Sequence, residues 1–141
     1  MKTMWSLIAL FVCTSFADQN GRSKLDANVQ KAVTESWNDV VVKTDKNGWM
    51  WIVTTKNTVK DMMYTAVLMQ ACLEINENKA ARKKLKKVMV LNKFKLQGYV
   101  FEQPIKCSEL VDAPMGKESD RMIISMTHLY MGEKESEMTG E

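Results

Sequence analysis

Apolar residues recur at three- and four-residue steps in two segments of the chain, which predicts two amphipathic helices. The first spans about residues 24–38 and follows Ser23, a residue type that is favoured at helix N-termini. The second opens at Thr58 with a capping-box-like pattern, and its apolar face is wide through Leu73. We expect this second helix to be the long central one, and the helical pattern continues or restarts over residues 79–87.

β-Branched and aromatic residues follow the first predicted helix and break its period. Residues 40–42 and 49–55 are rich in valine, tryptophan, isoleucine and threonine. They flank Asn47 and Gly48, a dipeptide typical of two-residue hairpin turns. The two runs are therefore predicted to pair as a β-hairpin.

The last third of the chain is interpreted as two or three further strands. Residues 88–91 and 93–102 are expected to be extended, with a bulge at Gly98, where the alternation changes phase. Residues 121–131 alternate apolar with polar side chains, which favours a strand over a helix. The sequence thus predicts an α+β fold, a small and mostly antiparallel sheet with one long helix and an N-terminal helix packed on one face.

The first seventeen residues have the order of a secretory signal peptide. Lys2 precedes an apolar run over residues 4–13, and Ser15 and Ala17 are the small residues expected before a cleavage site. The run is about ten residues long, whereas a membrane-spanning helix needs about twenty. We therefore expect residues 1–17 to be removed, leaving a secreted or periplasmic protein without a transmembrane segment.

Cleavage would leave one domain over residues 18–131 and a short acidic tail over residues 132–141 that is expected to be disordered. The remaining cysteines, Cys72 and Cys107, form an even pair, which predicts one disulfide in an oxidising compartment. A redox role is discounted because the pair lacks Cys-X-X-Cys spacing. Zinc is disfavoured because two thiols and one histidine leave its tetrahedron incomplete.

Lysine and arginine number 20 against 17 acidic residues, and a net charge of +3 is too small to predict a nucleic-acid partner. The densest cationic run follows the long predicted helix. It forms either a solvated helix end or a basic patch that binds an unknown protein or an anionic envelope component. Lys93 and Lys95 could extend this patch on an adjoining strand, and the acidic tail could mask it. The proposed patch consists of Lys79, Arg82, Lys83, Lys86 and Lys87.

We assign no catalytic residue, metal ligand or cofactor from the sequence. The single histidine, His128, lies in an apolar stretch and is interpreted as structural. One alternative is a Cu(I) carrier that uses the soft ligands Met122, Met126, His128 and Met131, although methionines at such spacing also pack in cores. Another is a small hydrolase whose paired carboxylates are hidden in the linear sequence.

Trp49 and Trp51 lie on the same face of a predicted strand, and the sequence leaves open whether they belong to the core or to a recognition surface. The favoured function is an exported, disulfide-containing binding or inhibitory protein that acts on a protein or envelope partner and is not catalytic. This hypothesis rests on the export signal, the small size, the cysteine pair and the lack of a catalytic motif.

Overall fold

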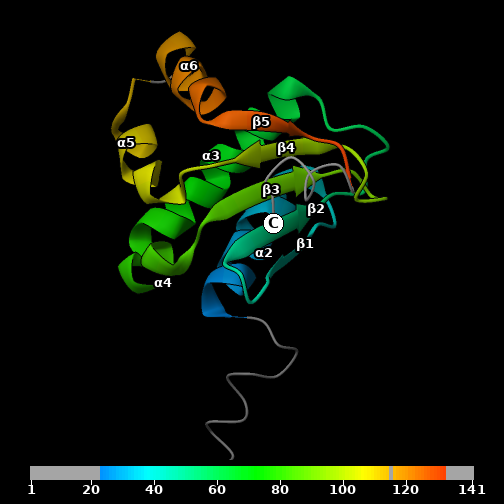
Figure 1. Ribbon diagram of the computed structural model, residues 1–141, viewed down its shortest axis with the longest axis horizontal. Helices are drawn as coiled ribbons and strands as arrows, with labels where there is room; N and C mark the ends of the chain where they lie inside the picture. Colours follow the sequence, from blue (N-terminus) through cyan, green and yellow to red (C-terminus); the bar gives the residue numbers. More distant parts are fainter. Residues whose placement is uncertain (1–22, 115, 133–141) are drawn as a thin grey trace, which may run out of the picture.

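The computed structural model describes residues 23–114 and 116–132. The predicted signal sequence and the tail beyond residue 132 lie outside this part of the chain. Within it, helices and one five-stranded sheet form a mixed α+β fold, which confirms the predicted fold class (Figure 1). No helix in the two described ranges is both long and apolar enough to cross a membrane.

Five strands follow one another across the sheet in chain order. The neighbouring pairs are antiparallel except for the second and third strands, which are parallel because a helical crossover joins them. The predicted hairpin is confirmed, and Asn47 and Gly48 belong to its turn, which spans residues 45–48. The strands are β1 (Val41–Thr44), β2 (Trp49–Val53), β3 (Lys87–Leu91), β4 (Gly98–Phe101) and β5 (Thr127–Tyr130).

Helices α2 (Lys24–Trp37) and α3 (Asp61–Glu77) lie behind the sheet in Figure 1. The Ser23 hydroxyl caps α2 by accepting the Asp26 N–H at 3.1 Å, as the residue type predicts. The main core is formed by apolar side chains of both helices and of the sheet face that packs against these helices. Leu68 is fully buried in this core. The first predicted helix therefore lies where the periodicity places it. The second begins at Asp61 and not at Thr58, and its N-cap, Lys60, makes no side-chain cap hydrogen bond, so the predicted capping box is wrong.

The chain turns back after α3 through a further short helix, α4 (Lys79–Lys84). The Asn78 side chain interrupts the helical run and accepts the Ala81 N–H at 3.1 Å, which caps the new helix. The sequence left open whether the helical pattern over residues 79–87 continues the preceding helix or restarts, and the structure shows that it restarts as a separate helix. After α4 the chain enters β3 at the end of the sheet where β2 also begins.

A second apolar cluster covers the opposite face of the sheet from α2 and α3. The Trp51 ring meets Tyr130 edge-on at 6.4 Å, and both tryptophans of the hairpin are half-buried. They are therefore packed against the sheet and are only partly open to solvent. The cluster consists of Met89, Leu91, Val100, Tyr130, Trp49 and Trp51.

The predicted strand over residues 93–102 is wrong in its first half. Residues 92–97 form a turn, and only Gly98–Phe101 pairs in the sheet. The Asn92 carboxamide oxygen accepts the N–H groups of Leu96 and Gln97 at 2.9 and 3.1 Å, which bends the chain back on itself. An Asn side chain that satisfies its own turn thus overrides the alternating pattern.

The predicted strand over residues 121–131 is also wrong in its first half. Residues 121–125 complete helix α6 (Lys117–Ser125), and the strand is only Thr127–Tyr130. Ile123 is fully buried, with Met122 and Met126 packed against the same core. These positions also fit a helical face, and tertiary packing decides between the two periods.

Cys72 of α3 and Cys107, the first residue of α5 (Cys107–Asp112), are fully buried and joined through their sulfur atoms. The Sγ–Sγ distance is 2.28 Å and the Cα–Cα distance is 5.0 Å. A short 3-10 helix, η1 (Pro104–Lys106), leads from the sheet into α5. The bond therefore ties α3 to the segment that leaves β4.

Candidate functional site

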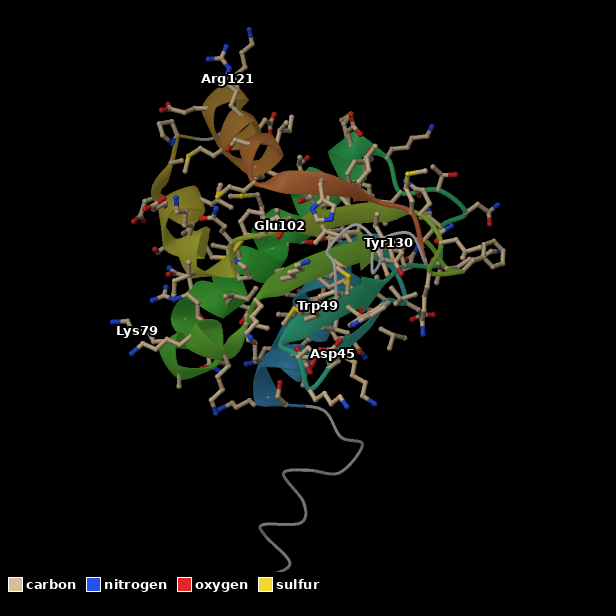
Figure 2. All side chains as sticks on the ribbon, in the orientation of Figure 1. Asp45, Trp49, Lys79, Glu102, Arg121 and Tyr130 are labelled. Carbon is tan, nitrogen blue, oxygen red and sulfur yellow. A yellow bond between two sulfur atoms is a disulfide. The ribbon has the colours of Figure 1, made fainter. Side chains whose placement is uncertain are left out.

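A hollow of about 1120 Å³ opens between the start of α2, the β1–β2 turn and the end of α4. Its lining comprises residues 23, 25 and 26, residues 44–49, and residues 81 and 83–86. Figure 2 labels Asp45 and Trp49 at this end of the hairpin. We call this site the basic hollow because four exposed lysines line it: Lys46, Lys83, Lys84 and Lys86.

The turn that forms one wall is organised by the Asp45 carboxylate. One oxygen accepts the N–H groups of Asn47 and Trp49 at 2.9 and 3.1 Å. The other accepts the indole N–H of Trp51 at 3.0 Å. Asp45 therefore fixes both the turn and the second strand, and its oxygens are engaged within the fold.

Gly48 brings this turn against the end of α4. Its φ of +84° is a left-handed conformation that favours glycine, and its carbonyl accepts the Lys86 N–H at 2.8 Å. A Cβ at this position would lie 2.4 Å from the carbonyl oxygen of Lys84. Through this approach Lys46, on the turn, lines the same hollow as the lysines at the end of α4 and just after it.

Asp26 is the other carboxylate in the lining, and it is 1% exposed. Its two oxygens accept the hydroxyl and the N–H of Thr44 at 2.5 and 2.8 Å. These bonds tie the first turn of α2 to the end of β1. Both carboxylates of the hollow are used to hold its walls together, and the four lysines outnumber them, so the lining is cationic in sum.

The predicted basic patch is divided by the structure. Lys83 and Lys86 line the hollow, whereas Lys79 lies on the outer side of α4 (Figure 2). Arg82 donates to the Asn76 side chain at 2.8 Å and so binds α4 to α3. The Lys87 ammonium lies 4.4 Å from the centroid of the Trp49 ring, a cation–π contact. The structure thus brings two of the five residues to the same site.

Sequence reasoning missed Lys46 and Lys84 as members of this site. Lys84 belongs to the same run, but Lys46 is distant in sequence and joins only through the packing of Gly48. The expectation that Lys93 and Lys95 extend the patch is wrong. β3 runs from Lys87, which pairs with Trp49, to its far end, so the turn that follows lies at the other end of the sheet.

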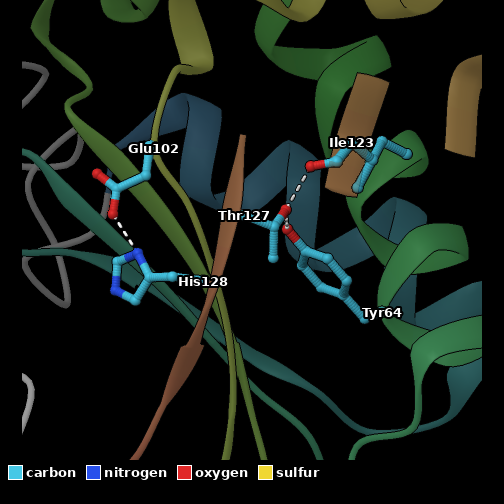
Figure 3. A network of polar contacts seen from close by, with 5 residues as sticks. All are labelled: Tyr64, Glu102, Ile123, Thr127 and His128. Carbon is cyan, nitrogen blue, oxygen red and sulfur yellow. Dashed lines mark hydrogen bonds and ion pairs between the residues drawn. The ribbon is translucent and has the colours of Figure 1, made fainter. Parts of the chain in front are cut away.

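A smaller pocket of about 240 Å³ lies beside the edge strand β5. Figure 3 shows the Tyr64 hydroxyl bonded to Thr127 at 2.5 Å, and the Thr127 hydroxyl donating to the Ile123 carbonyl. His128 points to the opposite side of the strand, where its Nδ1 contacts the Glu102 carboxylate. The histidine and the Thr127 hydroxyl therefore do not form one catalytic chain.

Two tyrosines of this pocket stack with their ring centroids 4.6 Å apart. Burial raises the pKa of the Tyr64 hydroxyl well above its usual value. A hydrogen bond from Tyr99 to the Asp61 carboxylate raises the pKa of Tyr99 to about 12, with smaller contributions from burial and from the charge of Asp61. Both hydroxyls are therefore neutral donors at physiological pH.

The four candidate copper ligands occupy different surroundings. Met122 and Met126 pack against the main core, and Met131 is exposed after β5. His128 contacts Glu102 on the other face of the strand from Thr127. In the described ranges, no three His, Cys, Asp or Glu side chains are grouped to hold a metal ion.

Comparisons with protein-family models, with curated proteins and with solved structures found no match to this chain. The ground for assigning a function is therefore the geometry of the molecule itself.

Proposed function

We propose that this protein is an exported binding or inhibitory module that docks an anionic surface of another protein at the basic hollow. The scaffold in this proposal is the mostly antiparallel sheet, with the long helix α3 and the N-terminal helix α2 packed on one face. The protein carries out no chemistry on its partner in this proposal. Binding depends instead on the match between its cationic rim and acidic groups of the partner.

One observation carries the proposal: lysines from two separate segments converge on one hollow whose carboxylates are already engaged. Lys46 comes from the hairpin turn, and Lys83, Lys84 and Lys86 come from the end of α4 and the residues after it. Asp26 and Asp45 accept hydrogen bonds within the fold. Like charges held together on the wall of a concavity focus its field and attract anions.

Export is supported by the order of charged, apolar and small residues over positions 1–17. The joined cysteines of α3 and α5 suit an oxidising compartment, where disulfides persist. A small binding protein outside the cytosol gains from such a crosslink because its core alone gives limited stability.

A hydrolase is the second candidate, since Asp26 and Asp45 line the same hollow. Paired carboxylates that act as acid and base must reach the substrate. Here Asp26 is almost fully buried and both its oxygens accept from Thr44. This arrangement favours a structural role for the pair and supports binding over hydrolysis.

The test is a calorimetric titration with a short glutamate-rich peptide at low and at high salt. The substitutions K83Q, K84Q and K86Q together should weaken binding at low salt by about tenfold, since each exposed charge pair contributes a few tenths of a kcal/mol or more. High salt should weaken binding of the unaltered protein and reduce the difference in affinity between the unaltered protein and the variant.

The matched control carries K31Q, K60Q and K117Q, which remove three exposed lysines that do not line the hollow. Its net charge equals that of the test variant, so it reports the effect of charge alone. Equal loss of binding in the two variants would show that the peptide senses net charge and not the hollow, and the proposal would be wrong.

A further inference from the structure

The turn over residues 92–97, between β3 and β4, lies at the far end of the sheet from the basic hollow. β3 begins at Lys87, opposite Trp49 at the hollow, and ends at Leu91, where the turn starts. In Figure 1 this turn projects at the right of the view, away from α4. We call it the Phe94 turn, and it is independent of the surface assigned to partner binding.

Two buried or half-buried amides hold the Phe94 turn in shape. Asn92 is 5% exposed; its oxygen accepts two N–H groups of the turn, and its nitrogen donates to the Asn57 carbonyl at 2.9 Å. The Gln97 side chain makes two hydrogen bonds to the backbone of Val59: it accepts the N–H at 2.8 Å and donates to the carbonyl at 2.9 Å. The turn is thus preorganised and fastened to the segment before α3.

This preorganised turn exposes apolar side chains. Phe94 is 60% exposed and Leu96 is 64% exposed. Exposed lysines surround them: Lys93 and Lys95 alternate with the apolar pair, and the Lys93 N–H donates to the Lys56 carbonyl at 2.9 Å. The Lys93 ammonium lies 4.9 Å from the centroid of the Phe94 ring.

A fixed turn with two apolar side chains between cations matches the interface of an anionic bilayer. Aromatic and aliphatic groups gain by entering the boundary between headgroups and acyl chains, and lysine stems extend along apolar surface while their ammonium groups reach phosphates. Charged residues, lysine above all, are depleted from the cores of stable protein interfaces, whereas here Lys93 and Lys95 alternate with the apolar pair. The charge pattern therefore favours lipid over a protein partner.

We propose that the Phe94 turn inserts Phe94 and Leu96 into the headgroup region of an anionic lipid bilayer, with Lys56, Lys93 and Lys95 contacting lipid phosphates. Because the turn and the basic hollow lie at opposite ends of the strands, membrane contact leaves the hollow facing away from the bilayer. This inference goes beyond partner binding at the hollow and holds whether or not that proposal is correct.

The test measures flotation with vesicles of phosphatidylcholine that contain a minority of phosphatidylglycerol. The full chain is produced in a secreting host, so that every variant carries the same processed N-terminus. We expect F94A with L96A to lower the partition coefficient by about tenfold, through loss of buried apolar area. K93Q with K95Q should lower it by about fivefold for each lysine.

The control for lost apolar area is L73A with I105A, because these side chains are 50% and 51% exposed elsewhere on the surface. We expect this control to bind vesicles as the unaltered protein does. The hollow variant with K83Q, K84Q and K86Q should lose less binding than K93Q with K95Q. Unchanged flotation of the F94A and L96A variant, or equal loss in the control, would overturn the proposal.

Amide hydrogen exchange locates the contact within the same protein. Adding the anionic vesicles should slow exchange in peptides that cover residues 93–96 and leave the β1–β2 turn, residues 45–48, unchanged. Protection at the β1–β2 turn without protection at residues 93–96 would place the membrane at the hollow and contradict the proposal. Thermal unfolding of each variant, followed by circular dichroism, separates loss of binding from loss of fold.

Discussion

Gly48 packs the hairpin turn against the end of α4. The substitution Gly48→Ala forces a side chain into a left-handed backbone and against the Lys84 carbonyl, 2.4 Å away. We expect it to lower the free energy of unfolding by about 2–3 kcal/mol, measured by urea denaturation. The turn should also move away from α4 and separate Lys46 from the other lysines of the hollow.

Gly116→Ala is the matched control for this substitution. Gly116 also has a positive φ, +108°, but no described atom within 4 Å of a Cβ placed there. It therefore reports backbone strain alone, and we expect a smaller loss than at Gly48, about 1–2 kcal/mol. Equal losses for the two substitutions would show that the approach of the turn to α4 adds nothing to stability.

Tyr64 should make the stability of the protein depend on alkaline pH. Burial raises its pKa in the folded state above the ordinary value of 10.0, so the folded state holds the proton more tightly than the unfolded state does. This contribution is complete below pH 10 and is lost as the pH rises toward the folded-state pKa.

Tyr64→Phe removes this group and provides the comparison. Urea denaturation should show a steeper loss of stability above pH 10 for the unaltered protein than for the variant. The variant also lacks the bond to Thr127, but that loss is the same at neutral and mildly alkaline pH. Parallel pH profiles of the two proteins would contradict the raised pKa.

The disulfide between α3 and α5 links two elements, and its removal can be tested directly. It closes a sequence separation of 35 residues, and in the chain-entropy model such a crosslink contributes about 3–4 kcal/mol. We expect C72A with C107A to lower the free energy of unfolding by that amount, and reduction of the unaltered protein to have a similar effect.

Alkylation followed by mass spectrometry checks the oxidation state directly. Without reductant, neither Cys72 nor Cys107 of the denatured protein should react, and after reduction both should. Two alkylated cysteines in the denatured, unreduced protein would contradict the crosslink. Equal stability of the double variant and the unaltered protein would show that the link constrains nothing.

Local sequence patterns predict the helices and turns whose formation depends on residues that are close together in the chain. The apolar period gives α2 and α3, and Asn47 with Gly48 gives the hairpin, because each needs only neighbours in sequence. The Phe94 turn was missed because Asn92 closes it through its own side chain and through Asn57, which lies far away in sequence. Helix α6 was missed because Ile123 suits either period, and its burial decides between them.

At the scale of the whole molecule, the sheet separates two surfaces. The parallel pairing of β2 with β3 puts the hairpin turn and the end of α4 together at one end, which creates the basic hollow. The same pairing sends the Phe94 turn to the other end. The run of lysines after α3 could be recognised in the sequence, but the addition of Lys46 depends on this pairing and could not.

We propose the basic hollow as the surface that meets the partner protein. Its most direct test places a photo-crosslinking amino acid at Lys83, on the hollow, or at Lys31, an exposed site on α2 outside it, in the organism that makes the protein. We predict one crosslinked protein from position 83, with a yield that falls as salt is raised, and none from position 31. A crosslinked partner from position 31 with none from position 83 would contradict the claim.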